Sequence, residues 1–186
     1  MNINEYMQIS RETGAYMDIE LDILEETLRI WKEKPGVNFE LIELRDGSIL
    51  AGFCLYNKIP HTDFSFDIIS FIVGRDYKNK AVGTRLLELL EENLNKNLHY
   101  TIIRVETSYI KEHALGDNFF LDSGFQMLGH IPSFYDKDND YFIYIKAVFP
   151  PKNEALPDNM EKDSEPGPDE ADGRPAEADG MNPEWS

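Results

Sequence analysis

The chain has 186 residues, of which 41% are hydrophobic, and a formal net charge of −17. This length fits one domain with an appendage, and the acidic surface argues against binding to nucleic acid or anionic lipid. The single cysteine, Cys54, rules out an internal disulfide and a cysteine-based zinc cluster. No signal peptide or bilayer-spanning run can be found, so we expect a soluble cytoplasmic protein with no membrane partner.

The first predicted element is a helix over residues 19–34, with Asp18 as its cap and Pro35-Gly36 as its stop. Helical spacing places five side chains on one face of it: Ile23, Leu24, Thr27, Leu28 and Trp31. Two strands follow, over residues 38–44 and 48–56, and the sequence Arg45-Asp46-Gly47 between them is a strong hairpin signal.

The remaining elements alternate between apolar strands and amphipathic helices. The pattern predicts strands over 66–73 and 102–109, a helix beginning near Ala81, a short helix over 117–123 ending at Gly124, and strands over 126–131 and 141–148. The helix after Ala81 has an apolar stripe of Val82, Leu86, Leu89, Leu90 and Leu94. A polar connection through 135–140 separates the last two strands. This order predicts a mixed sheet with helices packed on it, an α/β (α+β) fold.

The composition changes abruptly after Phe149. Residues 150–186 are rich in Pro, Asp, Glu, Ala and Gly, and from Pro151 onward they hold eleven acidic and three basic residues. Such a segment buries too little apolar surface to offset its ordering entropy. We therefore expect a folded domain over residues 1–149 and an acidic disordered tail over 150–186.

The most informative segment is the basic loop between the strand ending at Val73 and the helix beginning near Ala81. It gathers four cations in an acidic chain: Arg75, Lys78, Lys80 and Arg85. A helix N-terminus offers free amide groups and the positive end of the helix dipole, which favour phosphate. Asn79 is a candidate cap, and Gly83 lets a group approach the first turn closely. A solvated loop whose glycine only eases packing would have the same residues, and neither a P-loop nor a dinucleotide motif is present.

This segment resembles the acyl-CoA loop of the GNAT (N-acetyltransferase) superfamily, whose pattern Arg/Gln-x-x-Gly-x-Gly/Ala follows a strand ending in an apolar triplet. The matching residues are Phe71-Ile72-Val73 and then KNKAVG, residues 78–83. The likeness continues in VETSYIKEH (105–113), NFFLDSGF (118–125) and IPSFYDKDND (131–140), and in element order it spans about residues 1–148.

The resemblance implies a mixed, mostly antiparallel sheet of six to seven strands flanked by helices, with acetyl-CoA as acyl donor and no metal. It implies cofactor contacts from Phe71, Ile72, Val73, Lys78, Asn79, Lys80, Ala81, Val82, Gly83 and Thr84. Lys78 replaces the usual Arg or Gln, which keeps the charge but loses the fork geometry. Ala81 replaces the first glycine, and it can serve if its backbone angles are helical.

Acetyl transfer to an amine needs a base for the amine and a donor for the oxyanion. The resemblance implies an oxyanion donor from the backbone N–H near Ile72 or Val73. Asp67 and Glu106 are the candidate bases, although each could be an ordinary surface carboxylate, because strand alternation gives each about even odds of facing the cleft.

Phe120 stands where the family often has the tyrosine that protonates the leaving thiolate. A thiol with a pKa near ~8.5 can still leave, at a cost of about 2 kcal/mol. Three side chains could substitute as donor: Tyr109, His113 and Tyr135.

Specificity for the amine would lie in the first helix, in residues 57–64 and in residues 134–141, where Asp136, Asp138 and Asp140 could attract a cationic amine. The leading hypothesis is an N-acetyltransferase acting on a small molecule, an amino acid or a peptide amine. A non-catalytic acyl-CoA-binding module and an interaction protein on the same scaffold are the alternatives. The oligomeric state stays open, with a homodimer as one option.

Overall fold

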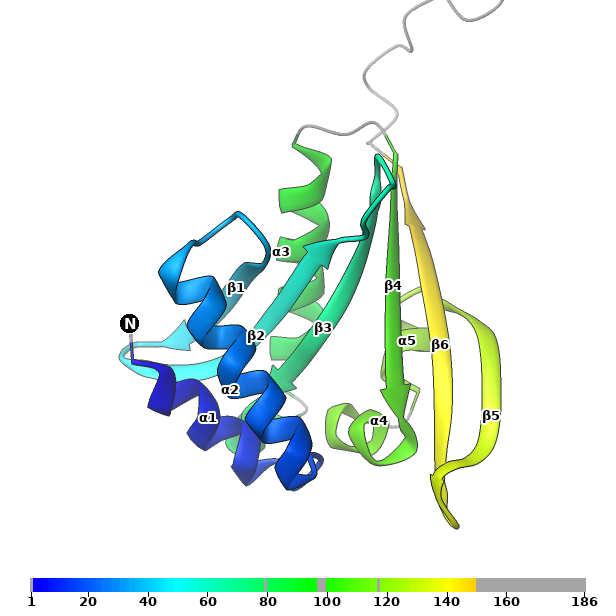
Figure 1. Ribbon diagram of the computed structural model, residues 1–186, viewed down its shortest axis with the longest axis horizontal. Coiled ribbons are helices and arrows are strands. Elements are labelled where there is room, and N and C mark those ends of the chain that lie inside the picture. Colours follow the sequence, from blue (N-terminus) through cyan, green and yellow to red (C-terminus); the bar gives the residue numbers. More distant parts are fainter. Residues whose placement is uncertain (1, 79, 97–99, 117, 150–186) are drawn as a thin grey trace, which may run out of the picture. The chain divides into compact units, whose positions relative to one another are not determined.

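The computed structural model describes residues 2–78, 80–96, 100–116 and 118–149, and Figure 1 shows their arrangement. The predicted acidic tail, residues 150–186, and the predicted cap Asn79 lie outside the described residues. The helices are α1 (Ile3–Glu12), α2 (Asp18–Glu33), the 3-10 helix η1 (Arg75–Tyr77), α3 (Val82–Asn95), α4 (Tyr109–Leu115) and α5 (Phe119–Asp122). The strands are β1 (Glu40–Asp46), β2 (Ile49–Lys58), β3 (Ser65–Val73), β4 (Thr101–Ser108), β5 (Gln126–Asp136) and β6 (Asn139–Val148).

The six strands form one sheet in the order β1-β2-β3-β4-β6-β5. Only β3 and β4 run parallel, and every other neighbouring pair is antiparallel. The parallel pair needs a crossover, which α3 supplies, whereas tight turns join the antiparallel hairpins. The predicted mixed, mostly antiparallel sheet flanked by helices is therefore confirmed, with six strands.

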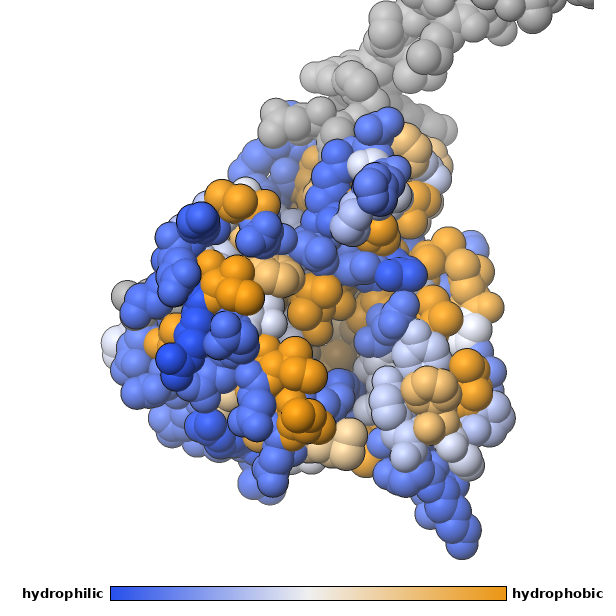
Figure 2. Space-filling model, viewed as in Figure 1, coloured by the Kyte–Doolittle hydropathy of each residue, from blue (hydrophilic) through white to orange (hydrophobic). Residues whose placement is uncertain are grey.

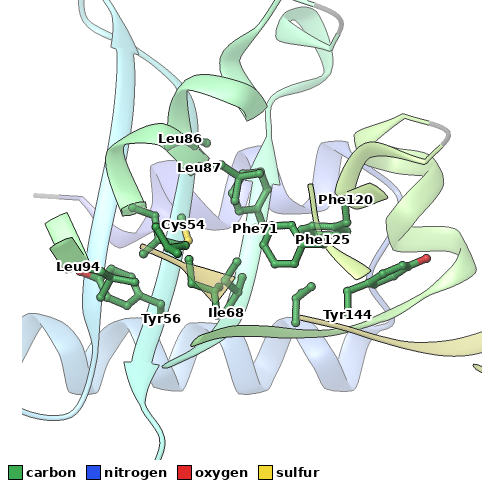
Figure 3. Packing of buried hydrophobic residues seen from close by; sticks show 14 of the residues in the cluster. Cys54, Tyr56, Ile68, Phe71, Leu86, Leu87, Leu94, Phe120, Phe125 and Tyr144 are labelled. Atoms are coloured by element: carbon green, nitrogen blue, oxygen red, sulfur yellow. The ribbon is translucent and has the colours of Figure 1, made fainter. Parts of the chain in front are cut away.

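Helices cover both faces of the sheet, with α1 and α2 on one face and α3 on the other (Figure 1). Under α1 and α2 lies a core cluster that includes Tyr6, Leu28 and Phe53. The larger cluster lies under α3 and α5 and includes Leu86, Phe71 and Phe120 (Figure 3). These clusters fix α3 against the end of β3, which sets the position of the basic loop between them.

Strands β3 and β4 pair at one end only. Their register runs from Ser65 opposite Ile102 to Ile68 opposite Val105, and beyond it the strands separate, as Figure 1 shows. The pairing of β3 with β2 is irregular at the same point, where Tyr56 opposes Ile68 and Leu55 opposes Ser70, so Ile69 is an extra residue. Such a bulge bends a strand and is common beside active sites. The result is a V-shaped gap between β3 and β4 that opens toward Val73 and Ser108.

The structure also corrects several details of the sequence analysis. Helices α1 and α4 were not predicted, and Asp18 is the first residue of α2 while Met17 is its cap. Ile23, predicted on the buried face, is 58% exposed, whereas Leu21 is buried. The connection over 135–140 is largely a continuation of the last hairpin, since Asp136 pairs with Asn139. Among the described residues, no helix combines the length and the apolar character that crossing a membrane requires.

Candidate functional site

The first turn of α3 presents backbone donors toward the end of β3. An α-helix leaves its first amide groups without intrahelical acceptors. Within the described chain, the first amide of this turn with a backbone acceptor is that of Arg85, which donates to the Ala81 carbonyl at 2.9 Å. Ala81, Val82, Gly83 and Thr84 precede it and are exposed or half-buried. Their amide groups are the ones that the sequence analysis assigned to a diphosphate.

The cations around this turn differ in their partners. Arg85 is bound to Glu88 at 2.9 Å and to Glu92 at 3.0 Å, so its charge is already neutralised. The Nζ atom of Lys80 lies 5.0 Å from the centroid of the half-buried Tyr77 ring. Lys78 is exposed on the same loop. Lys80 is therefore better placed than Arg85 to meet an incoming anion.

Ala81 has a left-handed backbone conformation, with φ 58° and ψ 9°. The sequence analysis made its suitability conditional on helical angles, and that condition is not met. For residues other than glycine this conformation costs about 1–2 kcal/mol because Cβ approaches the carbonyl oxygen. The usual glycine at this position thus has a physical reason, and the alanine here is strained.

The space beside the Gly83 Cα atom is filled by other protein side chains. A Cβ atom built at Gly83 would lie 2.9 Å from Cε2 of Phe119 and 3.6 Å from Cγ2 of Val73. The absence of a side chain at Gly83 therefore eases packing against Phe119 and Val73, as the alternative interpretation of this loop expects. Its backbone amide still belongs to the first turn of α3.

A cavity of about 520 Å³ begins at Thr84 and extends between α3 and the segment that contains α5. Leu87, Leu115 and Phe119 give it an apolar lining, and Lys146 lies at its edge in an ion pair with Glu91 at 2.5 Å. Because Thr84 belongs both to the first turn and to the cavity, the backbone donors and the cavity form one continuous surface.

The end of β3 offers further backbone groups to the gap. The Gly74 amide donates to the Ala51 carbonyl at 2.8 Å, so Gly74 faces β2. Successive residues of a strand point their backbone groups toward opposite edges, so Ile72 also faces β2 while Phe71 and Val73 face the gap. Of the two amides predicted as oxyanion donors, the Val73 amide has the suitable direction, and the Phe71 amide shares it.

The two predicted bases lie on the α1–α2 face of the sheet, on either side of Arg104. Asp67 is held by the guanidinium through two bonds, from Nε at 2.7 Å and from Nη2 at 2.8 Å. This bonding raises the pKa of Arg104 and occupies both carboxylate oxygens of Asp67. Glu106 lies 3.3 Å from Arg104 Nη1, and its side chain is 43% exposed. Glu106 is therefore the more available of the two carboxylates.

Two tyrosines border Glu106. Burial and a hydrogen bond to Glu106 raise the pKa of Tyr141 to about 12. Burial and the charges of Glu20 and Glu106 raise the pKa of Tyr135. Both phenols consequently stay protonated at neutral pH, and Tyr141 is a hydrogen-bond donor to the carboxylate.

Phe120 is a core residue with 1% exposure. Its ring stacks on Tyr144 at 5.7 Å and contacts Phe71 and Phe125 edge-on, at 6.1 and 5.3 Å (Figure 3). The Tyr144 hydroxyl donates to Glu112 at 2.9 Å, and that bond together with burial raises the pKa of Tyr144. The position that often holds a phenol in related proteins is thus filled by an apolar ring in an aromatic cluster.

The suggested substitute donors lie in different surroundings. Tyr135 is 39% exposed beside Glu106, and Tyr109 is 46% exposed at the start of α4. The side chain of His113 lies outside the part of the chain that is described. Tyr135 therefore lies within reach of the charge of the candidate base.

A small recess of about 90 Å³ lies between the α1–α2 side and the β5–β6 hairpin. Figure 2 shows a hollow on the face of the molecule that carries α1 and α2, with apolar side chains on its walls. Residues 14–17, Glu20, Ser108, Tyr135 and Asn139 contribute to the recess. It lies at the open end of the gap, because Ser108 is the last residue of β4.

A family model described as the acetyltransferase (GNAT) family matches residues 4–116. The chain belongs to the GNAT acetyltransferase family. No curated protein matches it significantly.

Solved structures share the fold at low sequence identity. A GNAT-family protein from Desulfovibrio desulfuricans has a TM-score of 0.68 at 19% identity, covering 78% of this chain and 91% of its own. The ribosomal-protein-S18-alanine N-acetyltransferase from Escherichia coli has a TM-score of 0.61 at 17% identity, with 83% and 93% covered. An aminoglycoside 6'-N-acetyltransferase complexed with coenzyme A has a TM-score of 0.60 at 18% identity, with 80% and 92% covered. The GNAT fold is thereby shown for this chain.

Sequence reasoning placed part of this GNAT site and missed the rest. Among the residues assigned to the cofactor, those that are described lie together at the end of β3 and the first turn of α3. Residues 57–64, suggested for amine specificity, join β2 to β3 at the closed end of the gap. Residues 134–141, also suggested for amine specificity, include Tyr135 and Asn139, which line the recess. The contributions of Tyr16 and Ser108 were not predicted, since these two residues are far apart in the sequence.

Proposed function

We propose that this GNAT protein transfers an acetyl group from acetyl-CoA to an amine. The observation that carries the proposal is the open edge of β3 together with the first turn of α3, whose amide groups before Arg85 have no backbone acceptor within the described chain. A pantetheine chain has amides that can pair with an open strand edge, and a diphosphate suits a helix N-terminus. The GNAT-like structure with coenzyme A supports the same choice of cofactor.

Two features of the residues present suit this cofactor, and one feature is unfavourable for binding it. The amide groups of Val82 and Gly83 and the lysines at 78 and 80 suit a diphosphate. The cavity beside Thr84 offers the rest of the cofactor a mixed surface, with apolar side chains and the carboxylates of Glu88, Glu91 and Asp122. The left-handed Ala81 is the unfavourable element, because it costs folding energy at the point where the loop must hold its shape. Bound acetyl-CoA would supply the thioester carbonyl that the amine attacks.

The chain would contribute a base, an oxyanion donor and a restraint on the base. Glu106 receives a proton from the amine, directly or through a water molecule, since it is the less occupied carboxylate. Tyr141 and Arg104 bind Glu106 and fix its orientation. The Val73 amide, which points into the gap, donates to the oxyanion as negative charge develops on the carbonyl oxygen.

The non-catalytic acyl-CoA-binding module stays as a second candidate because of Phe120. Its apolar ring cannot protonate a thiolate, and the nearby Tyr144 hydroxyl is bound to Glu112. The cost of losing such an acid is about 2 kcal/mol, which slows the reaction by tens-fold and leaves it measurable.

Calorimetric binding of acetyl-CoA, followed by release of free thiol with a panel of amines, tests the proposal. Saturable binding with amine-dependent thiol release is the expected result. Binding without thiol release would establish the binding module. No binding would leave the interaction protein, whose partner should be lost on truncation after Phe149.

A further inference from the structure

The amide side chain of Asn139 is buried without a partner for its oxygen. Asn139 is the first residue of β6 and is 5% exposed. Within the described chain, no donor bonds its Oδ1 atom, which is shielded from solvent. Folded proteins contain few such orphaned acceptors, and each calls for a physical reason.

The position of Asn139 supplies that reason. It lines the recess of about 90 Å³, together with Glu20, Ser108 and Tyr135. The other buried oxygens without donors among the described residues, those of Asn57, Asn95 and Thr101, belong to residues that do not line this recess. Asn139 therefore combines an unsatisfied, shielded acceptor with a position in the wall of the recess.

The recess borders the candidate base. Ser108 lines it, and Glu106 lies two residues earlier on the same face of β4. Burial and the charges of Glu20 and Glu106 also raise the pKa of Tyr135, which lines the recess. On this side of the sheet the carboxylates of Asp67, Glu106 and Glu20 face the cations Arg104 and Lys111. The excess of one negative charge favours a cationic ligand over an anionic one.

The size of the recess limits what enters. Its volume has room for only a few water molecules. A −CH₂–NH₃⁺ end fits such a space, whereas a second substituent on the carbon or on the nitrogen competes with the walls. The wall formed by residues 14–17 ends in α2, and Tyr16 is anchored there by a hydrogen bond with Ser70 and by Lys111 over its ring at 4.7 Å.

We propose that Asn139 is the specificity-determining residue for the acceptor, and that the acceptor is an unbranched primary amine whose N–H donates to Asn139 Oδ1. This inference rests on the proposed acetyl transfer and names its acceptor class. Of the three protons of the ammonium group, one passes to Glu106. As the new C–N bond forms and the C–S bond breaks, the nitrogen releases a second proton to the leaving thiolate. The third stays in the amide product and keeps its bond to Asn139. A secondary amine ends with no N–H and loses that bond during the reaction.

Three isomeric amines provide a matched probe: n-butylamine, sec-butylamine and N-methylpropylamine. They share formula and charge and differ only in branching and in substitution of the nitrogen. With acetyl-CoA saturating, thiol release by the wild type should give the highest kcat/KM for n-butylamine. Asn139→Leu should lower that kcat/KM about tenfold or more and remove the preference over N-methylpropylamine.

Two further variants separate a specific role from a structural one. Asn139→Asp retains an acceptor oxygen and adds negative charge, so it should keep the preference for n-butylamine. Asn95→Leu removes another buried, unpartnered oxygen at the end of α3 and should leave kcat/KM unchanged for all three amines. An unchanged ranking of the amines in Asn139→Leu would overturn the proposal, and so would an Asn139→Asp variant as impaired as Asn139→Leu.

Calorimetric titration of n-butylamine into the chain saturated with coenzyme A distinguishes this inference from the proposed function. Asn139-dependent binding of n-butylamine without thiol release would support an amine site at Asn139 and overturn the proposed acetyl transfer. Thiol release by the wild type, with an amine ranking that does not change in Asn139→Leu, would support acetyl transfer and overturn the role of Asn139 in selecting the amine.

Discussion

The first turn of α3 and the recess beside Asn139 are built in different ways. The first turn takes its donors from the backbone of one continuous segment, which ends β3 and begins α3. The recess takes its chemistry from side chains of the α1–α2 connection, the end of β4 and the last hairpin. A backbone site depends on conformation and tolerates exchange of side chains, whereas a side-chain site changes with a single substitution. The shared cofactor of a family suits the first kind, and a variable acceptor suits the second.

Among the side chains near the recess, Glu106 should give the largest loss of activity when it is replaced, in the variant Glu106→Gln. Removing the base should lower kcat by about 10²–10⁴-fold, because proton transfer from the amine loses its acceptor. Acetyl-CoA affinity should not change, since Glu106 lies away from the first turn of α3. Steady-state thiol release and calorimetry measure the two quantities.

Asp67→Asn is the matched control for Glu106→Gln. It breaks the bidentate pair with Arg104, so it should lower the free energy of unfolding by about 1–3 kcal/mol, with a smaller loss of kcat than Glu106→Gln. A larger loss of kcat in Asp67→Asn would reverse the assignment of the base.

Lys78→Glu combined with Lys80→Glu tests the electrostatic part of the backbone region. Reversing both charges should weaken acetyl-CoA binding at least about tenfold, and the effect should shrink as ionic strength rises. Lys34→Glu with Lys58→Glu makes the same change in net charge at exposed positions elsewhere and should leave affinity nearly unaltered. Equal affinities in both double variants, measured by calorimetry, would mean that the diphosphate lies elsewhere.

Gly83→Ala asks whether the first turn is open for a ligand or for packing. The added methyl group meets the Phe119 ring at 2.9 Å, so the free energy of unfolding should fall by about 1–3 kcal/mol. The double variant with Phe119→Leu should recover part of that loss in thermal or denaturant unfolding. A Gly83→Ala protein of unchanged stability that binds acetyl-CoA poorly would assign the space to the cofactor instead.

Ala81→Gly should give the smallest change of these variants, and it should raise the free energy of unfolding where Gly83→Ala lowers it. Relief of the left-handed strain, less the added entropy of the unfolded chain, should raise the free energy of unfolding by about 0.5–1 kcal/mol. Ala147→Gly lies in an extended strand and should lower it. Melting temperatures of the two variants check the contrast, and a lower value for Ala81→Gly would contradict the strain at that position.

The sequence predicted the backbone region well because its signals are local. An apolar run ending at Val73, a basic loop and the amphipathic stripe after Ala81 are contiguous, and together they determine where a helix N-terminus meets a strand. The side-chain region depends on which distant segments meet. Helix α1 has few apolar residues in its pattern, and Asn139 sits in a run of Asp and Asn that is typical of a solvated turn. Nothing local indicates that Asn139 is buried while Asp138 is exposed and Asp140 is half-buried.

The parallel pairing of β3 with β4 also marks a division of the chain into two parts. Everything up to α3 supplies β1, β2 and β3, and everything from β4 onward supplies β4, β6 and β5. Between these two sets of strands, the sheet is joined by the four opposed residue pairs of β3 and β4. One backbone break between α3 and β4 would therefore release two uninterrupted fragments, each with three adjacent strands. Their reassembly in a fragment complementation assay would report on the integrity of the substrate gap itself.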